Sequence, residues 1–272
     1  AIESEYGMLT EMVGQGTWNQ PAGTTTDDTA QALAIARSLV ERGEFDPTDI
    51  AERFVAWYES DPFDIGAMTR DSIRRLQQGE PWHEAGANVW RNRPEGQNAG
   101  NGSVMRAPSL AVAFMEDDSQ LVEVSRKSSK ITHADQRCTY GTAVLNLTIA
   151  AILRGDTDPL GLAITTVEDD APQELLDSLA PLVSEGSEPQ LATSGYVIHT
   201  LQTALHDGLR ADSAKEAIIQ AVNRGGDTDT VGAVTGAIAG ARFGADAIPD
   251  RWTEEINEQG EIEQLTEGLS VL

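Results

Sequence analysis

Residues 24–40 read TTTDDTAQALAIARSLV and join an acidic turn to a helical pattern. From this turn onward, apolar side chains recur three and four positions apart: Ala32, Ile35, Ala36, Leu39 and Val40. This spacing is typical of an amphipathic helix with one face in a protein core, and Gly43 can end it. Asp27 and Asp28 then lie in its first turn. The sequence therefore predicts a helix that begins at a pair of carboxylates.

The same periodicity continues along the chain. Residues 46–58 begin with Asp-Pro and carry apolar residues at helical spacing. Further helices are expected at 68–76, 119–130, 139–153, 172–183, 195–206 and 214–222. No segment has the alternating pattern or the turn of a β-hairpin, and no Pro/Gly/Ser-rich linker divides the chain. We therefore predict an all-α fold, a compact orthogonal multi-helix bundle, in a single domain of residues 1–272.

Glycines recur every fourth residue at Gly232, Gly236, Gly240 and Gly244, with alanines beside them. On a helix, residues four apart share one face, and such small residues allow another helix to approach closely. The pattern predicts a helix in the centre of the bundle. The stretch is too short, and contains Arg242, so it does not fit a membrane span.

The charge of the chain is strongly negative. It has 19 basic and 44 acidic residues, which gives a net charge of −25. This charge repels nucleic acids and anionic membranes, so we expect neither a nucleic-acid surface nor a membrane partner. Lysine occurs only at Lys127, Lys130 and Lys215, and acidic residues are spread throughout, a composition typical of proteins from salt-loving organisms.

The single cysteine, Cys138, excludes an internal disulfide framework. Neither a secretion signal nor an apolar run of membrane length is visible in the sequence. Together these features predict a cytoplasmic location in a halophilic organism.

A second acidic cluster, Asp227-Thr228-Asp229-Thr230, lies 200 positions after the first and also precedes a helical pattern. Helix capping could explain one acid in each cluster, because carboxylates stabilise helix N-termini by roughly 0.5–2 kcal/mol. It does not explain four carboxylates with interleaved threonines. Mg²⁺ and Mn²⁺ prefer oxygen ligands, so the two clusters together predict a metal site.

Two other segments contain candidate ligand contacts. Residues 98–106 hold glycines, amides and a hydroxyl, and could direct backbone N–H groups at an anion, although an ordinary loop is the favoured explanation of this segment taken alone. His133, in Thr132-His133-Ala134-Asp135, is either a ligand contact or a histidine at a helix end.

Five motifs, taken in order, resemble the ADP-ribosylglycohydrolase family. They are residues 23–30 (GTTTDDTA), 63–66 (FDIG), 101–106 (NGSVMR), 133–135 (HAD) and 225–230 (GGDTDT). The resemblance covers most of the chain. It implies an all-helical fold with two Mg²⁺ or Mn²⁺ ions in a central dinuclear cleft, and hydrolysis of the glycosidic link between ADP-ribose and a protein side chain or small acceptor.

The resemblance also implies roles for individual residues. For the metal ions it implies Thr26, Asp27, Asp28, Asp227, Asp229 and Thr230, with Asp229 bridging the two. For the substrate it implies Asp64, Gly66, Asn101, Gly102, Ser103, Met105, Arg106 and His133.

The family carries a glutamate near the metal ions after an N-terminal helix. The chain begins at Ala1-Ile2-Glu3-Ser4-Glu5, which is similar to the end of that element, so the resemblance suggests that the family's N-terminal helix is missing. Glu3 is the first candidate for the glutamate and Glu5 the second. We expect Glu3 or Asp28 to assist proton transfer while positive charge builds on the anomeric carbon.

The sequence leaves two other functions open. One is metal-dependent hydrolysis of a different nucleoside-type N-glycosidic bond. The other is a catalytically silent protein that binds ADP-ribose or has a structural role. The acceptor, the metal used in the cell and the oligomeric state are not determined by the residues.

Overall fold

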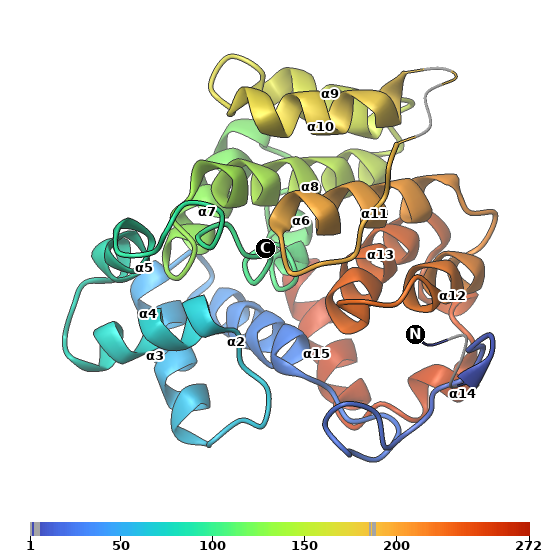
Figure 1. Ribbon diagram of the computed structural model, residues 1–272, viewed down its shortest axis with the longest axis horizontal. Coiled ribbons are helices and arrows are strands. Elements are labelled where there is room, and N and C mark those ends of the chain that lie inside the picture. The colour runs from blue at the N-terminus through green and yellow to red at the C-terminus, as the bar shows by residue number, and fades with distance from the viewer. Residues whose placement is uncertain (1, 3–5, 185, 187–188) are drawn as a thin grey trace.

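The computed structural model describes residues 2, 6–184, 186 and 189–272. In this part of the chain the elements are helices, and no β-strand forms (Figure 1). One isolated β-bridge joins Gly100 to Tyr196. The helices are α2 (Asp27–Arg42), α3 (Pro47–Glu59), α4 (Ala67–Gln77), α5 (Trp82–Arg91), α6 (Pro108–Ala113), α7 (Asp118–Lys130), α8 (Gln136–Arg154), α9 (Pro159–Val167), α10 (Gln173–Val183), α11 (Val197–Arg210), α12 (Ala214–Asn223), α13 (Thr228–Phe243), α14 (Asp250–Thr253) and α15 (Gln259–Leu269), with a 3-10 helix η1 (Ala245–Ala247). The all-α prediction is confirmed.

The first two long helices end where the sequence signals lie. Helix α2 stops at Gly43, whose φ of 69° is left-handed and whose N–H donates to the Leu39 carbonyl at 2.9 Å. Glycine adopts this conformation without a steric penalty. Helix α3 begins at Pro47, and the preceding Asp46 carboxylate accepts hydrogen bonds from the Thr48 and Asp49 amides.

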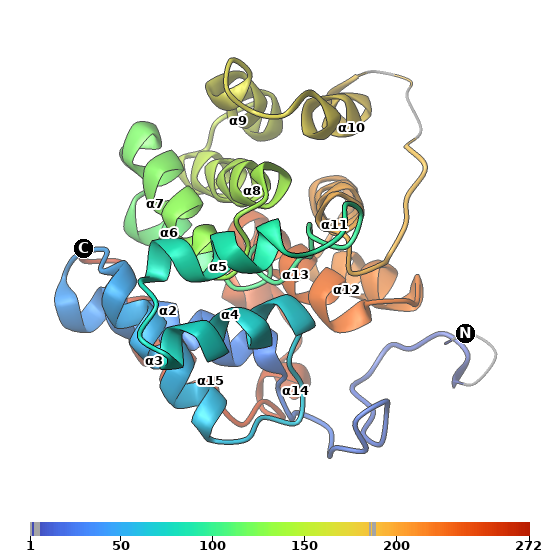
Figure 2. The same ribbon diagram turned by 60° about the vertical axis from the view of Figure 1, so that its left-hand side comes forward.

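Helix α8 lies in the middle of the molecule. It packs against α7, α9, α6, α11 and α13, and its residues from Cys138 to Ala151 are all buried. Because neighbours surround it, α8 is apolar around most of its circumference and carries only a weak amphipathic pattern. Helices α9 and α10 form an outer layer above α8 and α11, whereas α2, α3 and α4 lie on the opposite side (Figure 2). No helix in the described ranges is long and apolar enough to cross a bilayer.

The glycine pattern lies on α13, which packs against α11, α12 and α8. Gly232, Gly236 and Gly240 are only partly buried, and a Cβ on Gly240 would meet nothing within 4 Å. The close approach occurs at Gly208 of α11, where a Cβ would lie 2.8 Å from the Ile238 side chain. Helix α13 therefore packs on α11 through its β-branched face, whereas its glycine face lies toward α12, where a Cβ on Gly232 would lie 3.4 Å from the Val222 side chain.

Candidate active site

The two acidic clusters both lie at helix starts, as predicted. Thr26 precedes α2 and Asp227 precedes α13, but neither side chain makes a capping hydrogen bond. The Thr26 hydroxyl instead donates to Asp28 Oδ2 at 3.2 Å. Asp227 Oδ2 accepts a hydrogen bond from Asn101 Nδ2 at 2.7 Å. Helix capping therefore does not account for the clusters, and these side chains turn toward other groups.

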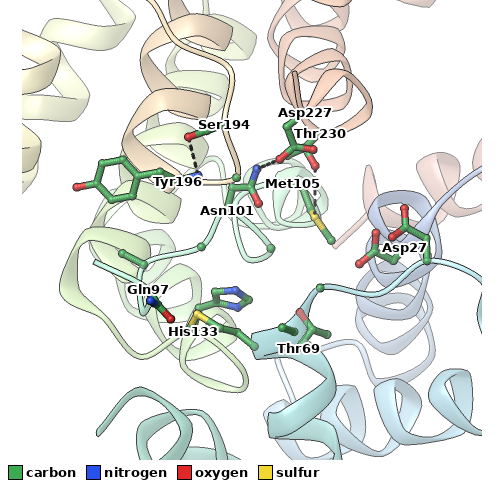
Figure 3. Close-up of a pocket in the computed structure, with 18 of the residues that line it drawn as sticks. Asp27, Thr69, Gln97, Asn101, Met105, His133, Ser194, Tyr196, Asp227 and Thr230 are labelled. Carbon is green, nitrogen blue, oxygen red and sulfur yellow. Dashed lines mark hydrogen bonds between the residues drawn. The ribbon is translucent and has the colours of Figure 1, made fainter. Parts of the chain in front are cut away.

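Both clusters border one cavity of about 510 Å³ (Figure 3). Among the residues singled out from the sequence, its lining includes Asp27, Asp64, Gly66, Asn101, Gly102, Met105, His133, Asp227, Asp229 and Thr230. These residues come from segments far apart in the chain. The structure thus brings the two ends of the sequence to one concave surface.

Burial and mutual repulsion raise the pKa values of these carboxyl groups. For Asp28, which is 4 % exposed, burial raises the pKa well above its ordinary value, and Asp229 and Asp27 raise it further. The pKa of Asp27 is raised first by burial, although the Gly66 amide, which donates to its carboxylate, lowers it. Burial also raises the pKa of Asp227. Burial, Asp27 and Asp229 raise the pKa of Asp64 to about 6.

The oxygen atoms of these acidic residues fit a divalent cation. The Asp28 Oδ1 atom is buried and has no hydrogen-bond partner, and such an atom costs free energy unless a ligand satisfies it. The surrounding donors are carboxylate and hydroxyl oxygens, which suit Mg²⁺ or Mn²⁺. Within the described residues, however, no three His, Cys, Asp or Glu side chains are already arranged around one ion position. Some carboxylates would have to reorient to coordinate a metal.

A second cavity, of about 480 Å³, adjoins the same acids. Asp64, Asp227 and Asp229 line both cavities, and Thr26 lines only the second. Trp18 and Phe63 also line this second cavity, with ring centroids 6.1 Å apart. Both aromatic side chains are more than 40 % exposed, so they form an open aromatic rim beside the carboxylates.

The loop of residues 98–106 forms one side of the first cavity. The Asn101 amide N–H donates to the Gly195 carbonyl at 3.1 Å, and its side chain donates to Thr200 as well as to Asp227. Gly102 is required here, because a Cβ at this position would lie 2.8 Å from the His133 ring. The loop therefore holds Asp227 and lies directly against His133.

Two of the predicted substrate residues lie behind the cavity wall. Arg106 is fully buried and donates hydrogen bonds to Gln31 and Thr132. Ser103 is 1 % exposed and accepts a hydrogen bond from Thr142 at 3.2 Å. Neither Arg106 nor Ser103 is among the lining residues of the cavity. Within residues 101–106, the cavity is lined by Asn101, Gly102 and Met105, and not by Ser103, Val104 or Arg106.

Other predicted site residues lie outside the cavity lining or outside the described residues. Asp28 and Thr26 are not among the lining residues of the main cavity, and Asp28 is buried next to the lining residue Asp27. Glu3 and Glu5, the candidates for the proton-transferring glutamate, lie outside the described residues.

The cavity also contains residues that the sequence did not single out. They are Met68, Thr69, Arg93, Gln97, Ser194 and Tyr196. Tyr196 reaches the site because Val197 N–H donates to the Ala99 carbonyl at 3.1 Å, a contact between segments about 100 residues apart. Arg93 is the one Arg or Lys side chain among the described lining residues, and it pairs with Asp71 at 2.6 Å. No local pattern marks such long-range contacts.

Comparisons with known proteins agree with this geometry. The family model described as ADP-ribosylglycohydrolase matches residues 1–272. The ADP-ribosyl-[dinitrogen reductase] glycohydrolase of Rhodospirillum rubrum is 33 % identical over 96 % of this chain and 83 % of its own length. The ADP-ribosylarginine hydrolase Tri1 of Pseudomonas putida is 30 % identical over 96 % of this chain and 70 % of its own.

More distant relatives and solved structures give the same picture. The human ADP-ribosylhydrolase ARH3 is 26 % identical over 90 % of this chain and 77 % of its own. A solved structure titled "ADP-ribosylglycohydrolase-related protein complex" superposes with a TM-score of 0.82 and 33 % identity, covering 98 % of this chain and 88 % of that one.

Proposed function

The chain belongs to the ADP-ribosylglycohydrolase family, and we propose that it cleaves the glycosidic bond between ADP-ribose and a protein side chain or small acceptor. The observation that carries this proposal is the meeting of Asp27 with Asp227 and Asp229 around one cavity, although they lie about 200 positions apart. The substrates would be ADP-ribosylated proteins or small ADP-ribosyl compounds.

Two divalent cations, Mg²⁺ or Mn²⁺, are part of the proposal. The residues that would hold them are Thr26, Asp27, Asp28, Asp227, Asp229 and Thr230. The unpartnered Asp28 Oδ1 and the raised pKa values of Asp27, Asp28 and Asp227 support this assignment, because a cation would compensate their buried negative charge. Bound cations supply water activation and orientation of the ribose hydroxyls.

The chain's own groups then act on the proton and on charge at the sugar. Asp28 is the candidate for proton transfer, because burial and the neighbouring carboxylates Asp229 and Asp27 raise its pKa above the ordinary value. Glu3 keeps the same role as an expectation from the family. The carboxylates around the cavity also favour positive charge at the anomeric carbon, which builds up as the glycosidic bond breaks.

The ADP-ribose portion would be bound by the part of the cavity that is lined by residues 101–102, Arg93 and His133. The loop at Asn101 and Gly102, together with Arg93 and His133, offers donors to phosphate and hydroxyl oxygens. Asp64 and Gly66 would contact the ribose side, beside Asp27.

For the acceptor, we favour an arginine side chain in the second cavity. That cavity combines Asp64, Asp227 and Asp229 with the aromatic rim of Trp18 and Phe63, and no Lys, Arg or His is among its described lining residues. A guanidinium group pairs with carboxylates and stacks on aromatic faces, whereas a serine hydroxyl does neither. Relatives named for ADP-ribosylarginine support the same choice.

The acceptor is tested with two substrates, ADP-ribosylarginine and ADP-ribosylserine. We expect faster hydrolysis of the arginine link. We also expect Trp18→Ala to lower kcat/KM for that link by about tenfold, with Trp18→Phe close to wild type. Faster hydrolysis of the serine link, or equal loss on both links, would contradict the arginine assignment.

The reaction itself is tested by release of ADP-ribose from a modified protein at high salt with Mg²⁺. EDTA should abolish release, and Mg²⁺ or Mn²⁺ should restore it. Asp229→Ala should lower the rate by at least about 100-fold. Absence of turnover by the wild-type chain, or unchanged turnover in Asp229→Ala, would defeat the proposal.

Two other functions are distinguished from this proposal by calorimetric binding of ADP-ribose and by turnover assays. A silent binder would take up ADP-ribose without releasing it from a modified protein, and the Glu3 position, which lies outside the described residues, is the feature that would distinguish it. A hydrolase of another nucleoside-type N-glycosidic bond would turn over a free nucleoside instead. A cytoplasmic location in a halophile stays part of the proposal, supported by the net charge of −25.

A further inference from the structure

Arg106 is a fully buried cation whose described hydrogen-bond acceptors are neutral. Its guanidinium donates to Gln31 Oε1, to Thr132 Oγ1 at 2.7 Å and to the Ser128 carbonyl at 3.4 Å. It also lies 4.5 Å from the centre of the Phe54 ring. Burying an arginine without a directly paired carboxylate is costly, so simple packing explains it poorly.

The first neutral acceptor, Gln31, connects Arg106 to Asp27 on the acidic wall of the cavity. Gln31 is fully buried, and its side-chain amide has one oxygen and one NH₂ group. Because a guanidinium can only donate, Arg106 must take the Gln31 oxygen, and the NH₂ group is then directed at Asp27 Oδ2, 3.2 Å away. Reversing the amide would place two donors face to face at Arg106 and two acceptors face to face at Asp27.

The second neutral acceptor, Thr132, connects Arg106 to His133 on the opposite wall of the cavity. The Thr132 hydroxyl has a single hydrogen, and its oxygen already accepts from Arg106. Thr132 is fully buried, so this hydrogen is satisfied by His133 Nδ1, 2.7 Å away. Nδ1 is then the acceptor, and the ring proton lies on Nε2, next to Gly100 and Gly102 of the cavity loop. Burial and Arg106 lower the pKa of His133 to about 3, which keeps the ring neutral.

We infer that Arg106 is a positioning residue that orients both walls of the site at once, holding Asp27 through Gln31 and fixing His133 through Thr132 as an Nε2–H donor toward the cavity. It acts without touching the ligand. The donor-only chemistry of the guanidinium gives both hydrogen-bond chains one possible direction, which a neutral side chain would not do. For the identity of the ligands the inference rests on the proposed function.

The His133 chain is tested first, in the metal-free protein without ligand. Long-range ¹H–¹⁵N spectra of histidine, assigned with a His133→Asn variant, should show the Nε2–H tautomer with Nδ1 accepting a hydrogen bond. Thr132→Ser should preserve this signature and the affinity for ADP-ribose. Thr132→Val should remove the signature and weaken ADP-ribose binding by about tenfold in calorimetry. An Nδ1–H tautomer or a charged ring in the wild type would overturn this part.

The Asp27 chain is tested by calorimetric titration with Mn²⁺. Gln31→Met has nearly the same volume but cannot donate to Asp27, and we expect its Mn²⁺ affinity to fall by about tenfold, as is usual when the group orienting a metal ligand is lost. Its His133 spectrum should stay as in the wild type. Conversely, Thr132→Val should leave Mn²⁺ affinity unchanged. Unchanged Mn²⁺ affinity in Gln31→Met would overturn this part.

The Arg106→Lys variant tests both hydrogen-bond chains at once. A lysine keeps the positive charge, but its single nitrogen cannot serve both chains, so both the Mn²⁺ affinity and the His133 signature should be affected. Wild-type behaviour in both measurements would overturn the inference. If the wild-type chain itself bound neither Mn²⁺ nor ADP-ribose, the proposed function would fail, whereas the tautomer of His133 would still decide the role of Arg106.

Discussion

Two pairs of adjacent aspartates begin helices in this protein, and their surroundings differ. Asp117 caps α7 by accepting a hydrogen bond from the Gln120 amide at 2.9 Å, and Asp118 pairs with Arg154 at 3.0 Å. Asp27 and Asp28, at the start of α2, make neither a capping bond nor a pair with a basic side chain among the described contacts. One pair is exposed and compensated, and the other is buried and uncompensated.

Under the proposed function, this difference separates a structural acid from a functional one. A carboxylate at a helix N-terminus stabilises the helix whether or not it has another role. Burying two carboxylates side by side opposes folding, because desolvation and repulsion both favour their protonated forms. A protein keeps such a cost where the charge serves binding or catalysis. Dipeptide identity alone would not have distinguished the pairs.

The largest expected difference between the pairs is in catalysis. Asp28→Asn should lower the rate of ADP-ribose release by at least about 100-fold, because it removes a carboxylate that would hold a metal ion. Asp118→Asn, the matched change in the exposed pair, should alter the rate by less than about twofold. Rates would be measured at saturating Mg²⁺. Equal losses in the two variants would break the comparison.

Stability should change in opposite directions in the two pairs. In the metal-free protein, Asp28→Asn should raise the free energy of unfolding by about 0.5–2 kcal/mol, because it removes a buried repulsive charge. Asp117→Ala should lower it by about 0.5–2 kcal/mol, because the α7 cap is lost. Denaturant unfolding at neutral pH measures both. A stability loss in Asp28→Asn would show that its charge is compensated after all.

The pH dependence of stability sharpens the same contrast. The folded protein raises the pKa of Asp64 to about 6 from an ordinary value of 3.8, so it binds the proton more tightly than the unfolded chain. The stabilisation from this proton is complete below pH 3.8 and is lost as the pH rises through 6. The Tm of the metal-free protein should therefore rise as the pH falls from 7 to 5, and less so in Asp64→Asn. A steeper rise in Asp64→Asn than in the wild type would contradict this sign.

The smallest difference concerns salt. Raising KCl to about 1 M shortens the screening length to about 3 Å, which relieves repulsion among exposed acids. With a net charge of −25, the protein should gain Tm on going from dilute buffer to molar KCl. The buried pair is screened far less, so Asp28→Asn should show the same salt response as the wild type. A Tm that does not change with KCl would count against adaptation to high salt.

Helices with clear local signals could be predicted from the sequence, and those with tertiary causes could not. Helices α2 and α3 were predicted because both have apolar residues at amphipathic spacing. Acidic residues begin α2 and Gly43 ends it, and Asp46-Pro47 begins α3. Helix α5 was missed, partly because Gly86 lowers its helix propensity. The glycine is needed there, because a Cβ would lie 2.4 Å from the Lys130 carbonyl oxygen. Helix α9 was missed as well, since it is only nine residues long and apolar without a clear face.

The site shows the same limit. The acidic clusters were singled out because their residue types are unusual in sequence, and the loop at Asn101 was singled out through the family resemblance. Tyr196 and Arg93 were not found, because long-range backbone and side-chain contacts bring them to the cavity. Arg106 was identified, but its position behind the wall depends on Gln31 and Thr132, which no short motif connects.

The most direct test is a crystal structure of the protein grown with Mn²⁺ and ADP-ribose, with anomalous scattering recorded at the manganese edge. The account predicts two manganese peaks between Asp27 and Asp28 on one side and Asp227 and Asp229 on the other, with ADP-ribose in the cavity beside His133. Peaks elsewhere on the protein, or ADP-ribose bound with these four carboxylates free of metal, would contradict it.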